Sequence, residues 1–227
     1  MSNPNLLTSS IGKKFLMSIT GLCLILFLLF HATMNTVAIF SGDAYNKVCE
    51  FLGTNWYALI GTAGLALGMV IHFVYAFILT LQNRKARGND KYAEAVRPAS
   101  VEWASNNMLV LGIIIILGIV LHLSQFWYKM MFAELAGVEG TYGTTDGAAW
   151  IAYYFSQAPV AISYIIWLVA IWFHLTHGFW SAFQTIGWNN KTWMSRLQCL
   201  GDIVATIICL AFVAVVVFFF VQGCCAA

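Results

Sequence analysis

All five histidines of this chain lie inside long apolar runs, and those runs contain none of its eleven Lys and Arg or nine Asp and Glu residues. The five are His31, His72, His122, His174 and His177. An ionisable side chain inside a bilayer is costly and usually marks a functional site. The sequence therefore predicts membrane spans that carry a site built from imidazoles.

The apolar runs are long enough to cross a bilayer as helices. The 227 residues are 61% hydrophobic and 9% charged, whereas a soluble domain has about 25% charged residues. A helix needs ~20 apolar residues to span the hydrocarbon core. The runs that meet this length are residues 15–40, 56–81, 104–128, 160–183 and 203–221. We expect an all-α polytopic membrane protein with five transmembrane helices, forming a single domain over residues 1–227.

The basic residues indicate how the chain is oriented. With alternating spans, nine of them fall on the side of the N-terminus, and only Lys47 and Lys129 fall on the other. Basic residues gather on the cytoplasmic side of a membrane. We therefore expect a cytoplasmic N-terminus and an outer C-terminus in the inner (cytoplasmic) membrane. The first run is longer than the ~7–15 apolar residues of a signal peptide, so it is predicted to stay as a span.

The connecting segments give weaker indications. Ser9 or Ser10 is a suitable N-cap for the first span. Residues 45–52 predict an amphipathic helix lying at the membrane interface. Residues 129–159 contain four glycines among Thr and Asp, which predicts a loop of turns. The six cysteines show no metal-binding spacing and are interpreted as apolar filler. The net charge of +2 gives no reason to expect a nucleic-acid partner.

The depths of the histidines sort them into two pairs. A rise of 1.5 Å per residue places His31 and His122 ~25–28 Å from the cytoplasmic ends of their helices. The same rise places His72 and His174 ~18–20 Å from theirs. Spans one and three therefore supply an outer pair, and spans two and four supply an inner pair.

Two histidines at one depth on facing helices suit bis-histidine haem ligation in a bundle. Gly68, Gly118 and Gly178 lie one turn from histidines and would leave clearance for a porphyrin. Bis-histidine iron has no open coordination position, so the site predicts electron transfer through two b haems. His174 and His177 are only ~60° apart around their helix, and spacing alone leaves either as the ligand. The other would make a hydrogen bond beside the haem.

Two other interpretations compete with haem binding. A single intramembrane histidine can simply hydrogen-bond a neighbouring helix. A histidine-lined proton or metal transporter would use broken helices or intramembrane carboxylates, and the five runs contain no Asp or Glu.

The chain resembles the five-helix, di-haem cytochrome b membrane subunit of succinate:quinone oxidoreductases, which comprise succinate dehydrogenases and fumarate reductases. The similarity extends over essentially the whole length. It is carried by His31-x-x-x-Asn35, by Gly68-x-x-x-His72, by His122 within LHLSQFW, and by His174-x-x-x-Gly178-Phe179-Trp180. Each motif alone is weak, but the ordered set within five spans is specific.

The resemblance implies roles for individual residues. His72 and His174 would bind the haem nearer the dehydrogenase, and His31 and His122 would bind the distal one. It also favours His174 over His177 as the ligand, because the family motif places Gly and an aromatic residue four positions after it. Some members have a glutamate near the distal haem that serves quinol oxidation, and Glu50 is the best match, with a solvated interfacial charge as the alternative.

The resemblance further implies partners and one departure. A flavoprotein and an iron–sulfur subunit would dock on the cytoplasmic side, the substrate would be menaquinone or ubiquinone, and the heterotrimers would form dimers. The dicarboxylate chemistry would lie in the partner subunits. A related branch has a glutamate two residues before the span-four ligand for proton transfer, where this chain has Trp172. The runner-up is the cytochrome b subunit of another respiratory enzyme, such as a hydrogenase or a formate dehydrogenase.

Overall fold

The protein is an all-α bundle in the part of the chain that the computed structural model describes, residues 9–87, 103–188 and 190–226. That part holds five helices long and apolar enough to cross a membrane, and no strand, which confirms the predicted fold class. The long helices are α1 (Ser10–Phe40), α3 (Trp56–Arg87), α4 (Trp103–His122) with its continuations η1 (Leu123–Phe132) and α5 (Ala133–Ala136), α7 (Ala158–Ile186) and α8 (Lys191–Ala226). Two shorter helices are α2 (Gly42–Thr54) and α6 (Gly147–Phe155).

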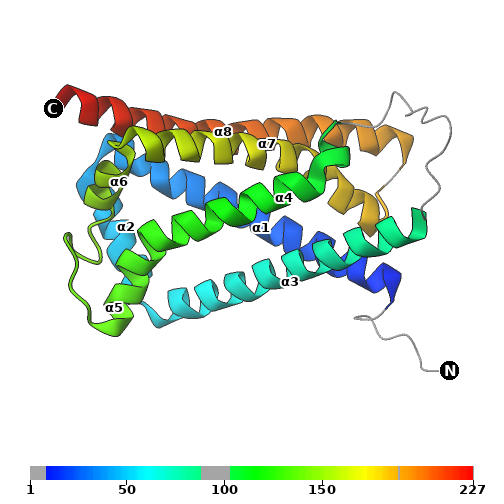
Figure 1. The fold of residues 1–227 in the computed structure, drawn as a ribbon, viewed down its shortest axis with the longest axis horizontal. Coiled ribbons are helices and arrows are strands. Elements are labelled where there is room, and N and C mark those ends of the chain that lie inside the picture. Colours follow the sequence, from blue (N-terminus) through cyan, green and yellow to red (C-terminus); the bar gives the residue numbers. More distant parts are fainter. Residues whose placement is uncertain (1–8, 88–102, 189, 227) are drawn as a thin grey trace.

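The long helices run side by side, so the bundle has two ends (Figure 1). At one of them, here called the Ser10 end, α1 and α8 begin and α3 and α7 finish. At the other, here called the Ser41 end, α2 and α6 cross the bundle and α5 completes the α4–η1–α5 helix. Lys13, Lys14 and Lys191 lie at the Ser10 end, whereas Lys47 and Lys129 lie at the Ser41 end. Lys91 and Arg97, two of the nine basic residues expected on the side of the N-terminus, lie outside the described residues.

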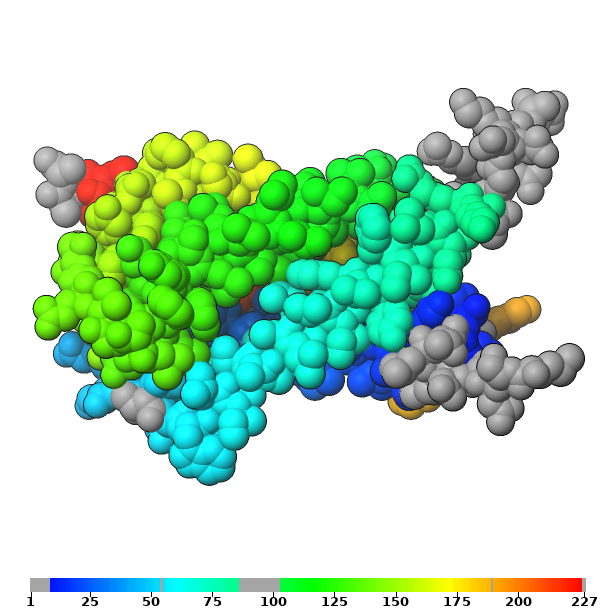
Figure 2. All heavy atoms as spheres, turned by 60° about the horizontal axis from the view of Figure 1, so that its bottom comes forward, coloured from blue at the N-terminus to red at the C-terminus, as the bar shows by residue number. Residues whose placement is uncertain are grey.

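Helices α7 and α8 are the best-buried of the long helices, and α7 lies against α1, α4 and α8. Leu168 and Ile171 of α7 are buried, and so is Ile208 of α8. By contrast, α3 packs mainly against α1, and the apolar window of its span contains no buried residue. The bundle is therefore tight around α7 and α8 and loose around α3. Figure 2 shows the surface hollowed between α3, in cyan, and α4, in green.

Most of the long helices extend beyond the apolar runs from which they were predicted. Ser9 caps α1 by accepting a hydrogen bond from the Gly12 backbone N–H at 3.0 Å, which is one of the two predicted caps. Helix α7 ends at Gly187, whose φ of 106° is left-handed. Helix α8 starts at Lys191, twelve residues before the predicted span at residue 203. Hydropathy identifies only the part of a helix that lies in the hydrocarbon core. The helix itself can continue into polar sequence, because its backbone hydrogen bonds do not require apolar side chains.

The expectation of a loop over residues 129–159 was wrong in most of its length. The predicted third span continues through η1 and α5, and α6 follows after a turn at Gly137, whose φ is 63°. Asp146 caps α6 by accepting from the Ala149 N–H at 3.2 Å. Asn46 of α2 ties α6 to the bundle by donating to Asp146 at 2.7 Å and accepting from the Ala148 N–H at 2.9 Å. The predicted helix over residues 45–52 is confirmed as part of α2.

Candidate functional site

A cavity of about 1330 Å³ runs along the inside of the bundle between α1, α3, α4 and α7. All five histidines contribute to its lining. Its volume exceeds the ~300–1,000 Å³ of pockets that hold one drug-sized ligand. The lining is mostly apolar, and Lys14 and Glu134 are its charged residues other than histidine among the described part of the chain. The cavity is therefore large enough for more than one bulky apolar group.

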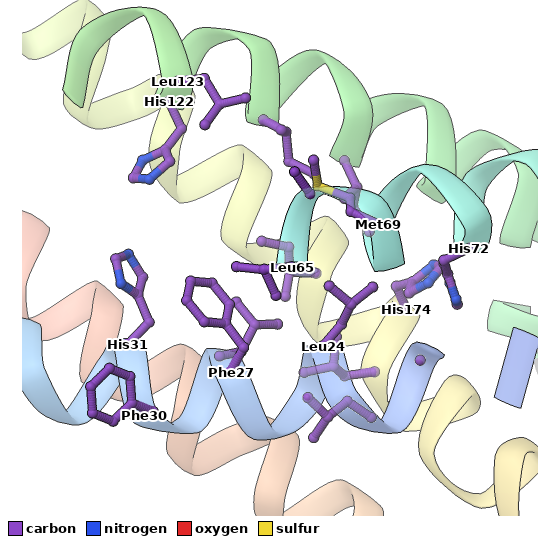
Figure 3. A pocket seen from close by; sticks show the side chains of 18 of the residues that line it. Leu24, Phe27, Phe30, His31, Leu65, Met69, His72, His122, Leu123 and His174 are labelled. Carbon is purple, nitrogen blue, oxygen red and sulfur yellow. The ribbon is translucent and has the colours of Figure 1, made fainter. Parts of the chain in front are cut away.

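The first imidazole pair lies toward the Ser41 end. His31 of α1 and His122 of α4 have ring centroids 5.8 Å apart, with an angle of 86° between the ring planes. Figure 3 shows the two rings pointing toward one another across the cavity. Spans one and three thus meet at the same height, as the depth estimate predicts.

The second pair lies toward the Ser10 end and joins α3 to α7. His72 and His174 have ring centroids 6.3 Å apart and ring planes at 69°. Figure 3 places them at the opposite side of the view from His31 and His122, with Leu24, Leu65 and Met69 between the pairs. The structure therefore brings four histidines together in the two expected pairs.

Aromatic rings and side-chain hydrogen bonds surround the pair at the Ser41 end. The Tyr164 hydroxyl lies 3.5 Å from Nδ1 of His122 and donates to Oε1 of Gln125 at 2.9 Å. Because its hydrogen is directed to Gln125, the Tyr164 oxygen can accept from His122. Across the cavity, Asn35 lies beside His31 with its Nδ2 3.4 Å from the His31 Nδ1. The Tyr45 hydroxyl donates to Oδ1 of Asn35 at 3.1 Å.

Tyr45 belongs to α2, outside the membrane-spanning helices, and its side chain is 9% exposed. Burial, reinforced by the neighbouring Cys49 thiol, raises the pKa of Tyr45 well above its ordinary value. The hydroxyl therefore stays protonated at neutral pH and remains a donor to Asn35. In this way α2 fixes the side chain that lies beside His31.

The pair at the Ser10 end has fewer side-chain partners. Nδ1 of His72 lies 3.3 Å from the Met17 carbonyl oxygen and 3.3 Å from the Thr20 hydroxyl. A backbone carbonyl accepts the Nδ1–H and leaves Nε2 for another partner. Gly21 makes room for this ring, since a Cβ there would lie 3.2 Å from His72 Cε1. On the facing helix, Nδ1 of His174 is buried and has no hydrogen-bond partner.

His177 lies on the same helix as His174 and also lines the cavity, but it is not in the ring contact with His72. Its ring contacts Trp180, with centroids 4.8 Å apart and planes at 82°. Where spacing left His174 and His177 as alternatives, the structure places His174 opposite His72.

The three glycines expected to give clearance differ in their surroundings. Gly178 lines the cavity, and nothing lies within 4 Å of the position its Cβ would take. The Gly68 position is equally open, although Gly68 does not line the cavity. Gly118 is buried beneath the indole of Trp167, which fills the space that the glycine leaves. Gly118 therefore allows α4 to pack closely on α7. A glycine one turn from a histidine looks the same in the sequence whether it makes room for a side chain or for a cofactor.

Glu50 is exposed on α2 and is not among the residues that line the cavity. The α2 residues that do line it include Val48, Cys49 and Leu52. Sequence reasoning missed Tyr164 and Glu134, both of which line the cavity. Tyr164 could have been noticed as a hydroxyl within an apolar run, whereas Glu134 lies in a segment interpreted as a loop.

The residues fit a metal that brings most of its own ligands. No group of three or more His, Cys, Asp or Glu side chains suited to a metal occurs among the described residues. A zinc ion, for example, takes four protein ligands in a structural site and three in a catalytic one. An imidazole nitrogen binds a metal at ~2.0 Å, as for zinc, so two imidazoles on opposite sides of one ion have centroids ~6 Å apart. The observed 5.8 and 6.3 Å match this spacing, which suits a planar macrocycle supplying the remaining ligands.

Comparison with protein-family models, with curated proteins and with solved structures gives no match for this chain.

Proposed function

We propose that this chain holds two b haems and passes electrons between a quinone and a soluble dehydrogenase or reductase. The observation that carries the proposal is the pair of imidazole contacts in one cavity, His31 with His122 and His72 with His174. Each pair lacks a third protein ligand in the described residues, so haem, which supplies four nitrogens, is the metal group that suits them. Haem held by these two pairs of histidines would supply one-electron transfer.

The chain's own residues hold and orient the ligands. The Met17 carbonyl and the Thr20 hydroxyl fix the ring of His72, so that its Nε2 is the nitrogen available to iron. Tyr164, itself oriented by Gln125, does the same for His122. The apolar side chains that surround the cavity exclude water and keep each site at low dielectric, which limits the reorganisation that accompanies a change of charge.

The two pairs lie toward opposite ends of the bundle, which supports conduction across the membrane. The five long apolar helices require a lipid bilayer, and the pairs lie at different positions along them (Figure 3). The four histidines would thus hold their two cofactors at different depths, one toward each end of the bundle. The basic Ser10 end is the side at which a flavoprotein and an iron–sulfur subunit would dock, consistent with a cytoplasmic N-terminus.

The assignment to the succinate:quinone oxidoreductase family rests on the motifs in the chain itself. Trp172, at the position where a related branch has a glutamate, donates its indole N–H to the Thr206 hydroxyl at 3.0 Å. It is therefore committed to joining α7 to α8 and supplies no carboxylate for proton transfer at that depth. We propose that electron transfer here proceeds without a proton route at Trp172.

Purification of the chain in detergent with its native partners tests the proposal. We expect a red protein with a b-type optical spectrum and two haems per polypeptide, together with a flavin-bearing partner. A colourless preparation would reject haem binding and revive the transporter alternative. Two haems with a hydrogenase or formate dehydrogenase partner would keep the cofactor and reject the family.

A further inference from the structure

One exposed face of α8 continues from the polar Ser10 end into the apolar span. Its residues recur every three or four positions, so they lie on one side of the helix. This face, here called the α8 stripe, consists of Trp193, Arg196, Leu200, Ile203, Ile207 and Leu210. Its apolar members are 47–61% exposed. The bundle is contacted by a different face of α8, on which Leu197, Ala205 and Ile208 are buried.

The polar end of the α8 stripe is a cluster of rings with one cation. The rings of Phe183 and Trp188 have centroids 5.6 Å apart, and those of Trp188 and Trp193 are 5.9 Å apart. The Arg196 guanidinium lies over the Trp193 ring, 5.5 Å from its centroid. A guanidinium that stacks on a ring uses its face and keeps the N–H groups in its plane for other partners. Because Arg196 is exposed, these donors can meet a ligand.

The ring cluster lies at the depth of the lipid headgroups. Phe183 ends the apolar run of α7, and Trp188 follows directly after Gly187, the left-handed residue that stops this helix. Tryptophan is enriched at this depth, where the membrane meets water. From Leu200 to Leu210 the stripe rises ~15 Å, which is half of the ~30 Å hydrocarbon core. The apolar part of the stripe therefore matches the acyl region of one leaflet.

The charges near the ring cluster favour an anionic ligand. Lys191 begins α8, and Lys13 and Lys14 lie at the same end of the bundle. The acidic residue of α8 is Asp202, six positions after Arg196 and thus ~120° away from it around the helix. A guanidinium binds phosphate through two parallel hydrogen bonds. Basic sites beside transmembrane helices at one membrane face are a known means of binding anionic lipid headgroups.

We propose that the α8 stripe binds an anionic phospholipid, with the phosphate on Arg196 and one acyl chain along the apolar residues from Leu200 to Leu210. A soluble partner would meet the ring cluster but not the part of the stripe inside the hydrocarbon core, whereas a phospholipid meets both. A glycerol headgroup leaves the phosphate charge uncompensated, whereas choline would place a second cation beside Arg196. None of the stripe residues lines the histidine cavity, so the lipid site is separate from the histidine pairs and does not depend on haem.

Photocrosslinking in lipid nanodiscs tests the site. The purified chain, with the subunits that accompany it, is placed in phosphatidylcholine nanodiscs containing a trace of a phospholipid probe with a diazirine in its acyl chain. The probe has either a glycerol or a choline headgroup, and mass spectrometry measures the labelled fraction of residues 200–210 after illumination. We expect the glycerol probe to label this segment about 10-fold more, as for one hydrogen-bonded contact to a charged group. Equal labelling by the two probes would overturn the proposal, because it is the result expected of unselective bilayer lipid.

Arg196→Gln should lower labelling by the glycerol probe about 10-fold, to the level of the choline probe. Arg196→Lys keeps the charge but loses the planar fork, so we expect a fall of about 3-fold. Lys129→Gln is the matched control, since Lys129 lies over the Tyr128 ring at 5.6 Å at the Ser41 end, and it should leave the labelling of residues 200–210 unchanged.

A preference for the glycerol probe that survives in Arg196→Gln would overturn the proposal. Should that variant fail to assemble, the comparison of the two probes on the unaltered protein decides. No labelling of residues 200–210 by either probe would also overturn it, in favour of a protein surface covering the stripe. A chain without haem would reject the proposed function and leave these labelling yields as expected, so the two failures are distinguishable.

Discussion

The two imidazole pairs share a residue type and a spacing, but their surroundings differ. His31 and His122 lie among rings, with Phe27 stacked on His31 at 5.2 Å and Phe126 beside His122 at 5.3 Å. His72 has a backbone carbonyl as a partner instead, and Nδ1 of His174 has no partner. One pair is thus positioned by several neighbouring side chains, whereas in the other pair only His72 has hydrogen-bonding partners, the Met17 carbonyl and the Thr20 hydroxyl of α1.

The difference teaches how one bundle can hold the same cofactor twice with different properties. An acceptor for the Nδ1–H of a ligating histidine raises the basicity of the other ring nitrogen and stabilises the oxidised metal. Partners that are side chains can be changed one at a time, whereas a backbone carbonyl cannot. The pair at the Ser41 end should therefore be the easier one to tune by substitution.

Removal of single histidines is expected to have the largest effect. His31→Ala and His122→Ala should each abolish the haem at the Ser41 end, and His72→Ala and His174→Ala the other one, because each iron loses an axial ligand. The haem-to-polypeptide ratio should fall from two to one, with the same spectral component missing within each pair. His177→Ala should keep both haems. Loss of a haem in His177→Ala and retention of both in His174→Ala would reverse the assignment on α7.

Filling the open space at Gly178 should act on one pair alone. Gly178→Leu places a side chain where nothing now lies within 4 Å, in the wall of the cavity near His174. We expect the haem at the Ser10 end to be lost or bound weakly, with the other one retained, as measured by haem content and spectrum. Gly112→Leu is the control, since its surroundings are equally open but it does not line the cavity. Two intact haems in Gly178→Leu would show that the macrocycle does not occupy this space.

The pairing was predictable from the sequence because helix rise is regular. Depth along the helices was enough to match His31 with His122 and His72 with His174. What surrounds each pair was not predictable, because it depends on helix rotation and on segments without periodicity. Gly118 beneath Trp167 depends on how α4 rotates against α7. Glu134 reaches the cavity because the third span continues as a helix through η1 and α5, and the sequence of that segment has no periodicity that predicts it.

Removing a hydroxyl group beside a ligand histidine should have a smaller effect than losing a haem. We expect it to change the midpoint potential of the haem at that pair. Tyr164→Phe removes the acceptor of the His122 Nδ1–H while keeping the ring. His122 then becomes a weaker base, so the midpoint potential of the haem at the Ser41 end should rise by about 20–60 mV, the equivalent of one ordinary hydrogen bond. Thr20→Val should raise the midpoint potential of the haem at the Ser10 end by a smaller amount, because the Met17 carbonyl remains as the acceptor for His72. Equal shifts in both variants would contradict the contrast between side-chain and backbone positioning. The midpoint potentials of both haems can be measured by redox titration followed by optical absorbance.

The smallest expected effect concerns α2 and α6, which cross the Ser41 end and should respond without loss of either haem. Cys49 of α2 is half-buried against Gly147, and burial, together with the negative charge of Asp146, raises the pKa of its thiol. Little thiolate is then present at neutral pH, so maleimide should label Cys49 more slowly than the exposed Cys224.

Asn46→Ala removes both hydrogen bonds between α2 and the start of α6. Labelling of Cys49 should then become several-fold faster, since each hydrogen bond contributes about 0.5–1.5 kcal/mol to keeping the segment closed. Haem content should stay at two, because neither helix carries a ligand. If Asn46→Ala instead released the haem at the Ser41 end, α2 would be holding His31 in place through Tyr45 and Asn35, and that pair would depend on the short helices as much as on the long ones.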